Sequence, residues 1–437
     1  MKIAIIGGGI SGLSVYLWLR KVGLLDGHSI TIYEAREAQD RSATAAANPE
    51  TYNASVIGAS IGLSPTGLHV LERLDPELHE EMLRTGHIIR TWRVSNARGW
   101  TLAKSAAGGG NEMMVMIGRE ACCQVLRNRV PDEAVVRRKV IDVTLANGNN
   151  GPRLVFQDQT IEEFDFVIAC DGIWSRTRRA MFGGQDLDQY EFSPRYEGLV
   201  GVGGFVPSSK LKGTPDGEMN VALGANGFFG YGYTTGDAQD SSKAGEMATW
   251  WSTYALNQCP DDWRNIDRED VKKELQKRHL GWQNTVIQNI VHDVEVESLI
   301  PTFITPLLPT WEKGGCVLVG DAAHALQPSS GQGASMALED CESLALLLDH
   351  YLREDQEGGL AKASKDYSDL RRPRLDMVFK KAQQLAGMKQ DMGVVQEMLM
   401  YFFVWLFSAL KVTESYERKL NAYDVPTEVL KVIRKAD

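Results

Sequence analysis

The chain opens with the stretch Lys2-Ile3-Ala4-Ile5-Ile6-Gly7-Gly8-Gly9-Ile10-Ser11-Gly12, an apolar run followed by the pattern G-x-G-x-x-G. The run predicts a buried parallel strand, and the apolar spacing after it predicts a helix. In that context Gly7 permits a tight turn, Gly9 lets a pyrophosphate approach the backbone, and Gly12 lets the helix pack close to the strand. Free N–H groups at the helix start favour bound phosphate. The stretch therefore predicts a Rossmann-like α/β domain.

A second predicted strand, Ser29-Ile30-Thr31-Ile32-Tyr33, ends in Glu34. The carboxylate of Glu34 lies about 20 residues past the glycines, where this motif places an acid on a ribose hydroxyl. A glycine-rich turn without a ligand is the alternative, but it does not account for the acid. Strand, helix, second strand and terminal acid together predict that the domain binds a dinucleotide.

The composition is that of an ordinary soluble globular protein, with 437 residues, 43% hydrophobic and 24% charged. The net charge of -10 and the pI of about 5.4 argue against nucleic acid or an anionic membrane as partner. The six cysteines have no metal-ligand spacing, which favours free thiols in a reducing compartment and no metal site. The short first apolar run is no secretory signal. These features predict a cytoplasmic protein.

One segment, Met398 to Leu410, is apolar all round. It is shorter than the roughly 20 residues that a bilayer span needs. We expect it to be a helix buried in the protein or in a contact between subunits, so an oligomer is possible. Attachment to a membrane surface is the alternative.

Loop and turn signals divide the chain into predicted elements after Glu34. Residues 35–57 predict a long surface loop, followed by a glycine-bearing apolar stretch over 58–63. Ser64-Pro65 predicts a helix start, with serine as N-cap and proline at the first helical position. Residues 88–94 and 100–103 predict a hairpin that belongs to a second, sheet-based domain.

The rest of the chain alternates strands with helices. The elements expected are a helix from Gly118-Arg119-Glu120, a hairpin over 140–145 and 153–157, a buried strand over 165–172, a strand-rich region over 191–300 with one helix near 268–279, a buried strand over 316–321, a loop over 322–333, a helix over 334–348 and a mostly helical remainder. Two of the buried strands end in an acid, Asp171 and Asp321.

Taken together, the turns at 7–12, 171–178 and 320–333 resemble those of the FAD-dependent class A flavoprotein monooxygenases of the p-hydroxybenzoate hydroxylase fold. The salicylate-hydroxylase-like branch is the most similar. This family carries G-x-G-x-x-G, D-G-x-x-S-x-x-R and G-D-A-A-H-x-x-x-P-x-x-G-Q-G. The chain matches the second pattern with Asp171, Gly172, Ser175 and Arg178, and the third throughout Gly320 to Gly333. The resemblance covers roughly residues 1–374.

The resemblance implies a Rossmann-like FAD-binding domain, an inserted mixed β-sheet substrate domain and a C-terminal helical region. The FAD-binding domain would comprise residues 1–182 and 301–350, except that the hairpin near 87–104 belongs to the substrate domain. The substrate domain would comprise residues 183–300, and the helical region residues 351–437.

The same resemblance implies a set of cofactor-binding residues. In it, Asp321 binds ribityl hydroxyls and the N–H groups of Gly333 and Ala334 face the flavin ring, whereas His324 holds its loop more than it acts on protons. The implied set is Gly7, Gly9, Ser11, Gly12, Glu34, Arg119, Asp171, Asp321, Pro328, Gly331, Gly333 and Ala334. Tyr231, Tyr233 and Pro328 are candidates to line the substrate pocket, although aromatic strand residues more often lie in the core.

The family implies a monooxygenase with non-covalent FAD. NAD(P)H reduces the flavin, O2 forms a C4a-hydroperoxide, and an electron-rich aromatic or polycyclic small molecule is hydroxylated or epoxidised, in secondary metabolism or aromatic breakdown. Relatives that act on anionic substrates carry an arginine after the Pro-x-Tyr-x-Gly stretch, and none follows Pro194 to Gly198 here. A flavin oxidoreductase without oxygen insertion and a flavin-binding interaction protein are the alternatives.

Overall fold

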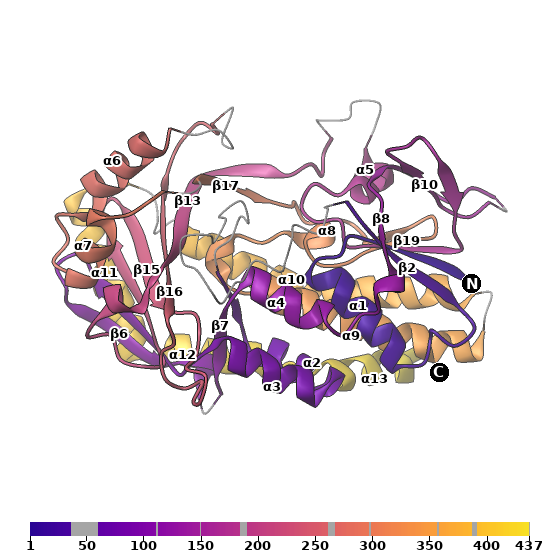
Figure 1. Ribbon diagram of the computed structural model, residues 1–437, viewed down its shortest axis with the longest axis horizontal. Coiled ribbons are helices and arrows are strands. Elements are labelled where there is room, and N and C mark those ends of the chain that lie inside the picture. The colour runs from indigo at the N-terminus through magenta and orange to yellow at the C-terminus, as the bar shows by residue number, and fades with distance from the viewer. Residues whose placement is uncertain are drawn as a thin grey trace.

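The computed structural model describes residues 1–35, 60–110, 112–148, 150–183, 190–260, 267–296, 299–355, 358–386 and 391–436. The loop expected over 35–57 therefore lies, from residue 36 on, outside the described residues, and so does Gly58. Figure 1 shows both ends of the chain at the same end of the molecule, beside β2 and α13 (Val425–Ala436).

The first sheet has six strands in the order β18-β19-β12-β1-β2-β8, and the strands from β19 to β8 run parallel. Their bounds are β1 Lys2–Ile6, β2 Ser29–Glu34, β8 Val135–Arg137, β12 Phe166–Ala169, β18 Glu312–Lys313 and β19 Cys316–Leu318. The central strand β1 is buried after its first residue, because helices cover the sheet. The strand expected before the glycine turn is β1 and the strand expected to end in Glu34 is β2, so both predictions are confirmed, as is the fold class.

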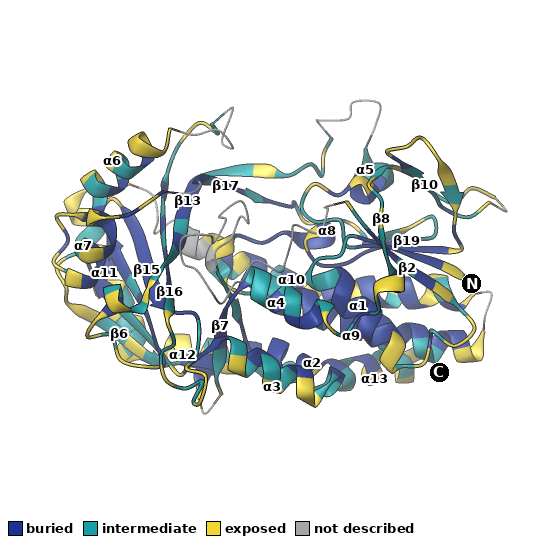
Figure 2. Ribbon diagram, in the orientation of Figure 1, coloured by how far each residue is buried: buried dark blue, intermediate teal, exposed yellow. Residues whose placement is uncertain are grey.

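Helices pack beside this sheet around one large apolar core (Figure 2). α1 (Ile10–Lys21) lies along α9 (Gly333–Glu354), which also contacts α2 (Pro65–Leu74) and α10 (Gly359–Ala386). α3 (Pro76–Thr85) and α4 (Arg119–Arg127) pack against each other nearby. The helix start at Ser64-Pro65 is confirmed, although the serine hydroxyl bonds Thr66 Oγ1 at 3.1 Å instead of a backbone N–H.

The second large sheet has seven strands in the order β17-β13-β16-β15-β14-β5-β6. Their bounds are β5 Thr91–Asn96, β6 Thr101–Ala106, β13 Arg195–Pro207, β14 Glu218–Gly224, β15 Gly227–Tyr233, β16 Met247–Ala255 and β17 Leu299–Ile304. α6 (Arg268–His279) and α7 (Thr285–His292) cover one face of it. The expectation of a single helix in this region is wrong, because Asn284 accepts bonds from the N–H groups of Val286 and Ile287 and so caps a second one.

Two small sheets complete the strands. One has the order β11-β10-β9 and contains the expected hairpin of β9 (Val140–Thr144) and β10 (Arg153–Phe156), extended by β11 (Ile161–Glu163). The other has the order β3-β7-β4, with β3 at Ser60–Leu63, β7 at Met114–Gly118 and β4 at His87–Ile89. The hairpin expected to start at residue 88 therefore starts at β5, since residues 87–89 pair with β7 instead.

The loop expected over 322–333 is wrong in part, since it contains two short helical turns. α8 (Asp321–His324) begins at the acid itself, and the 3-10 turn η5 (Pro328–Ser330) follows. α5 (Arg176–Phe182) follows the other acid turn. The C-terminal remainder is helical as expected, through α10, α11 (Val394–Ala409), α12 (Val412–Asn421) and α13.

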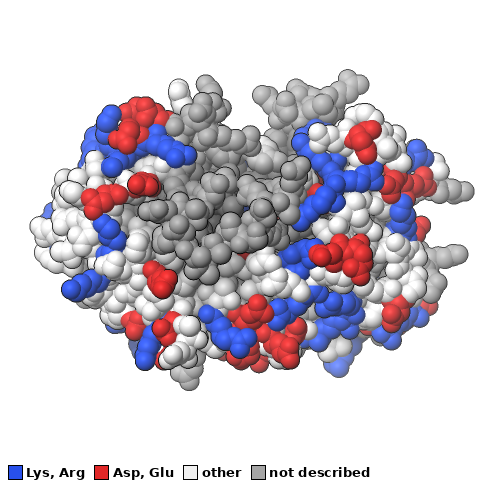
Figure 3. Space-filling view, viewed as in Figure 1, with Lys and Arg blue, Asp and Glu red and all other residues white. Residues whose placement is uncertain are grey.

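The expectation that Met398 to Leu410 is buried is wrong for the larger part of the segment. Only Met400 and Tyr401 of α11 are buried, and the rings of Phe402, Phe403 and Trp405 are about half exposed. In the described residues no single helix is long and apolar enough to cross a bilayer; α11 and α12 pass such a test only as a pair, which is bent by 64°. On the face shown in Figure 3, the described cationic and anionic side chains are intermixed.

Candidate cofactor site

The glycine turn after β1 has the geometry that its sequence predicts. Gly7 adopts a φ of +99°, and a Cβ at this position would lie 2.4 Å from the carbonyl oxygen of Cys170. A Cβ at Gly12 would lie 1.8 Å from the carbonyl oxygen of Gly7, so the helix packs directly on the turn. A Cβ at Gly9 would meet nothing within 4 Å, which leaves the backbone open on that side. α1 begins at this open side without a side-chain cap.

Glu34 lies at the end of β2, next to this turn. Its Oε2 accepts a hydrogen bond of 2.6 Å from the N–H of Gly8. The parallel pairing of β1 with β2 brings the carboxylate there, because Ile6 lies opposite Tyr33. The acid therefore borders the open side of the glycine turn.

Asp171 and Ser175 shape the second turn by capping α5. Asp171 Oδ2 accepts from the N–H groups of Arg176 at 2.8 Å and Thr177 at 3.2 Å, and Ser175 Oγ accepts from the N–H of Arg178 at 2.9 Å. Burial raises the pKa of Asp171 despite these bonds, which partly offset it. The side chains of this turn therefore stabilise the start of a helix.

Arg178 links the second turn to the third. Its side chain is fully buried, and its guanidinium donates to the carbonyl oxygen of Ala322 at 2.7 Å, to that of Ile173 and to the hydroxyl of Tyr190 at 3.2 Å. The guanidinium thus links, by hydrogen bonds, two loops that are far apart in the sequence.

The third turn meets the first. Gly320 has a φ of +62°, and a Cβ there would lie 2.4 Å from Ser11 Oγ. Asp321 follows with an exposed side chain at the start of α8. The three turns follow the neighbouring parallel strands β1, β12 and β19, and Glu34 ends β2 beside them. Gly9, Glu34, Asp171 and Asp321 therefore lie together at the carboxyl edge of this sheet. Ligands of open α/β sheets bind at this edge.

The N-terminus of α9 lies beside the third turn. η5 begins at the exposed Pro328, Gly331 has a left-handed φ of +63°, and α9 starts at Gly333 with no side-chain cap. Cβ atoms at Gly331 or Gly333 would meet nothing within 4 Å. The first N–H groups of a helix have no partner within the helix, so Gly333 and Ala334 present donors and partial positive charge there.

A buried network of charges holds the third turn in place. Among its members only His324 has a role predicted from the sequence. Asp340 Oδ2 accepts from the N–H of Gly320 at 3.1 Å and contacts His324 Nε2 at 2.5 Å. Arg371 donates to Asp340 Oδ1 at 2.8 Å and to Glu339 Oε2 at 2.7 Å. His324 therefore holds the loop. A charged pair inside the buried face of a predicted helix is the signal that could have revealed this network.

Burial would raise the pKa of Asp340, but the charges of His324 and Arg371 outweigh it and hold this pKa below its usual value. Arg374 adds bonds of 3.0 and 3.2 Å to Glu339. The network thus favours the ionised form of Asp340 inside the protein.

Arg119 opens α4 directly after β7, as the sequence predicts. β7 pairs with β3 so that Gly118 lies opposite Ser60. β3 in turn borders the third turn, because a Cβ at Gly62 would lie 3.8 Å from the carbonyl oxygen of Gly331. Arg119 thus begins its helix beside the strand that borders this site.

Tyr231 and Tyr233 do not reach this site. Tyr231 Oη accepts a bond of 3.3 Å from Asn284, and Tyr233 Oη donates to the carbonyl oxygen of Thr214 at 3.1 Å. Both rings are buried on the face of the seven-stranded sheet that α6 and α7 cover. Successive strand residues alternate between faces, so Gly230 and Gly232 of the same strand lie on the opposite face.

That opposite face looks toward the cofactor turns. Thr249 of β16 bonds Ser60 of β3 at 2.9 Å between their hydroxyl oxygens. On the same face, the indole of Trp251 lies across Gly230, since a Cβ there would be 2.2 Å from Cζ2 of the ring. Trp251 also packs against the apolar cluster that contains Met219. We call this surface the inner face of the large sheet.

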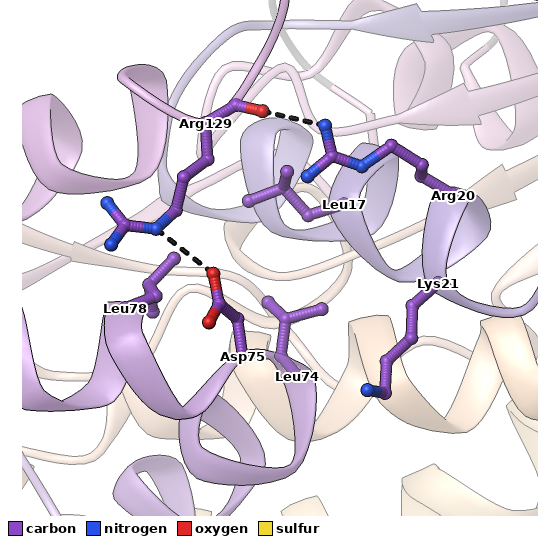
Figure 4. A pocket seen from close by; sticks show the side chains of 7 residues that line it. All are labelled: Leu17, Arg20, Lys21, Leu74, Asp75, Leu78 and Arg129. Carbon is purple, nitrogen blue, oxygen red and sulfur yellow. Dashed lines mark hydrogen bonds and ion pairs between the residues drawn. The ribbon is translucent and has the colours of Figure 1, made fainter.

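A surface hollow lies away from the turns, at the C-terminal end of α1. It measures about 260 Å³ and is lined by Leu17, Arg20, Lys21, Leu74, Asp75, Leu78 and Arg129 (Figure 4). Arg129 donates to Asp75 at 3.1 Å, and Arg20 donates to the carbonyl oxygen of Arg129 at 2.8 Å. Because its arginines bond protein groups, this hollow has little to offer a ligand.

The residues at the carboxyl edge fit a flavin dinucleotide. Space is open at Gly9, Gly331 and Gly333, an acid ends β2, and α1 and α9 both begin without side-chain caps. Such helix starts bind phosphate and other negative charge.

The match to known families agrees with this geometry. Residues 110–382, more than half of the chain, match the family described as FAD binding domain. The chain therefore belongs to this family, and the cofactor of its domain is FAD.

Two relatives illustrate the similarity in sequence. The chloroplastic zeaxanthin epoxidase of Prunus armeniaca is 26% identical over 408 residues, which cover 89% of this chain and 55% of that protein. The FAD-dependent monooxygenase penM of Penicillium crustosum is 23% identical over 407 residues, which cover 90% and 79%. The chain spans about half of the length of the zeaxanthin epoxidases that it matches.

Two solved structures share the fold. Klebsiella pneumoniae HpxO in complex with FAD and uric acid superposes with a TM-score of 0.75 at 18% identity, over 96% of both chains. A substrate complex of salicylate hydroxylase gives a TM-score of 0.73 at 21% identity, over 99% of this chain and 98% of the other. The resemblance to FAD-dependent class A monooxygenases is thus confirmed at the level of the fold.

Proposed function

We propose that this protein is an FAD-dependent monooxygenase, which uses NAD(P)H and O2 to insert one oxygen atom into a neutral, electron-rich small molecule. One observation carries the proposal: the uncapped N-terminus of α9 ends the third turn, and Gly331 just before it lies beside β3, which bonds Thr249 on the inner face of the large sheet through Ser60. The relatives named as an epoxidase and as a monooxygenase support oxygen insertion.

In this proposal the carboxyl edge of the first sheet holds the cofactor. Gly9 and the start of α1 bind the pyrophosphate, Glu34 the ribose, and Asp321 the ribityl hydroxyls. Ser11 and Asp171 support these contacts by shaping the turns. Bound FAD supplies the transfer of electrons and the activation of O2.

The start of α9 would act on charge. In the part of the chain that the structure describes, no side chain caps the start of α9, and a Cβ at Gly333 would meet nothing within 4 Å. A helix start stabilises negative charge nearby, here through the N–H groups of Gly333 and Ala334. Gly331 and Pro328 keep this start uncovered, since the left-handed turn at Gly331 directs the chain into the helix. Arg119 is a further candidate contact to the cofactor, through its place beside β3.

The inner face of the large sheet supports a neutral substrate. Strand register and alternation place these uncharged residues there, on five strands: Trp92, Val94, Gly201, Gly203, Phe205, Met219, Val221, Leu223, Phe228, Gly230, Gly232, Met247, Thr249, Trp251 and Thr253. Leu223 and Phe228 among them pack against α11, and the carboxylate of Glu197 on β13 accepts a bond of 2.6 Å from Gln327 of the third turn. A carboxylate on this surface would lose its hydration without gaining a cation. Because Gly230 has no side chain, the indole of Trp251 lies across it, and a flat substrate ring would stack on the other side of the indole.

The test uses the purified protein with bound FAD. We expect slow NAD(P)H oxidation alone and a marked increase with a neutral polycyclic or polyene substrate. With ¹⁸O2, one labelled oxygen atom should enter the product for each NAD(P)H consumed. A product whose new oxygen comes from water, or hydride transfer without oxygen insertion, would move the protein to the oxidoreductase alternative.

A further inference from the structure

α11 has two different apolar faces. Met400 and Tyr401 are buried against Leu223 and Phe228 of the large sheet, and the hydroxyl of Tyr401 donates to the carbonyl oxygen of Leu223 at 3.0 Å. Before the helix, the N–H of Met392 donates to the carbonyl oxygen of Ala225 at 3.0 Å. The helix is therefore fixed to the sheet on one side.

The other side of α11 is exposed and aromatic. Six large apolar side chains on it are 47–63% exposed: Leu399, Phe402, Phe403, Trp405, Phe407 and Leu410. Their rings contact one another, with centroids 5.6 Å apart for Phe402 and Phe403 and 6.0 Å apart for Phe403 and Phe407. We call these six residues the aromatic face. A helix that is apolar all round normally has both sides covered.

Two exposed cations lie near α11, whereas the one carboxylate of the helix, Glu397, is partly buried and bonds the hydroxyl of Tyr401 on the sheet side. From Met398 to Lys411 the only charged residue is Lys411, which is exposed at the end of the helix. α11 also lies against β6, and the turn that leads into β6 exposes Arg98 and Trp100. Exposed aromatic rings with cations at their edge are typical of helices that lie in the plane of a membrane interface.

From this arrangement we infer that the aromatic face rests on the surface of a lipid bilayer, with Arg98 and Lys411 at the headgroups. α11 has 16 residues and is about 24 Å long, which is shorter than the roughly 30 Å of a bilayer core. Its inner side is also occupied by the sheet, so it lies on the bilayer and does not cross it.

A second copy of the chain fits this surface less well. A two-fold contact presents the same patch on both subunits. In such a contact the run from Met398 to Lys411 offers no carboxylate to pair with Arg98 or Lys411, because Glu397 bonds Tyr401 on the sheet side. Anionic headgroups would supply that charge.

The inference goes beyond the proposed function and does not depend on it, because binding to vesicles is measured without NAD(P)H or substrate. The probe is phosphatidylcholine vesicles, with and without phosphatidylserine, sedimented with the full-length FAD-loaded protein. We expect the wild type to sediment with both kinds, and more with phosphatidylserine, because Arg98 and Lys411 act locally at the headgroups although the net charge of the whole chain is -10.

The main variant combines Phe402→Ser, Trp405→Ser and Phe407→Ser. Its bound fraction should fall at least about tenfold, since each ring contributes its own apolar area. Ile161→Ser with Leu307→Ser is the matched control, because both residues are exposed but lie outside the aromatic face. FAD content and thermal midpoint should match the wild type in both. Should the triple variant fail to fold, Trp405→Lys alone is the substitute.

A second variant, Arg98→Glu with Lys411→Glu, should lose only the increase that phosphatidylserine gives. The inference is overturned if the wild type stays in the supernatant with both kinds of vesicle, or if the triple variant sediments as the wild type does. A dimer in light scattering that the triple variant abolishes, without vesicle binding by the wild type, would assign the aromatic face to a second copy.

Discussion

Replacing Arg371 by methionine should destabilise the fold and the cofactor site together. The guanidinium of Arg371 is fully buried and bonds the carboxylates of Asp340 and Glu339 at 2.8 and 2.7 Å. Asp340 also holds the N–H of Gly320, which begins the third turn. Methionine keeps most of the volume but leaves two buried carboxylates short of a cation.

The expected magnitude follows from that burial. Removing one partner of a buried ion pair costs about 3–5 kcal/mol, a large part of the roughly 5–15 kcal/mol that stabilises a typical domain. The thermal midpoint should fall on the order of 10 °C. A second substitution, Asp340→Asn, should recover part of the loss in the Arg371→Met background, because it removes one of the two carboxylates that lose Arg371 as a partner.

The pH dependence has a definite sign. His324 and Arg371 hold the pKa of Asp340 below its usual value in spite of burial, so this carboxylate stabilises the fold above about pH 4 and the contribution is lost as the pH falls further. Without Arg371 its pKa should rise, and acid unfolding should begin at a higher pH.

Thermal unfolding and release of FAD fluorescence measure both effects. Lys365→Met is the control, since this lysine pairs with Asp369 on the surface and should not shift the midpoint. The reasoning fails if Arg371→Met unfolds within about 1 kcal/mol of the wild type with full FAD content, or if Asp340→Asn adds its own loss instead of recovering stability.

Three further outcomes are expected. Gly9→Val should purify folded but with little FAD, because only the ligand fills the space there; equal FAD content in the wild type and Gly9→Val would contradict this. Gly12→Val should fail to fold, because its Cβ would lie 1.8 Å from a carbonyl oxygen. Trp251→Ala should raise KM for the substrate at least about tenfold with unchanged FAD content. Tyr231→Phe, on the other face of the sheet, should leave KM unchanged. Similar KM values in the two variants would show that the inner face is not the substrate surface. Burial lowers the pKa of His279 to about 3. The free energy of unfolding should therefore fall by about 1.4 kcal/mol per pH unit as the pH drops below about 6.5. In denaturant titrations at several pH values, His279→Gln should flatten this slope.

Local sequence patterns predicted the elements near the cofactor well. Gly7, Gly9 and Gly12 have meaning within a few residues, because a turn and the helix start after it are set by backbone conformation. The same holds for the acids that end β2 and β12, since an apolar run followed by a polar residue marks a strand end. The carboxyl edge could therefore be assembled from the sequence.

Features that depend on distant partners could not be predicted in this way. Alternation shows that Tyr231 and Gly230 lie on opposite faces, but only the docking of α6 and α7 decides which face is covered. Arg371 meets Asp340 across 31 positions. The exposure of Phe402 depends on where α11 lies on the sheet, which its uniformly apolar sequence leaves open.

The two-sided packing of α11 bears on how activity would be measured. The helix covers the end of the inner face of the large sheet with one side and turns its rings outward with the other. An enzyme resting on a bilayer through such a helix meets lipophilic molecules by lateral diffusion in two dimensions. Its velocity would then follow the mole fraction of substrate among the lipids, and adding empty vesicles would slow the reaction by surface dilution while the bulk concentration stays constant.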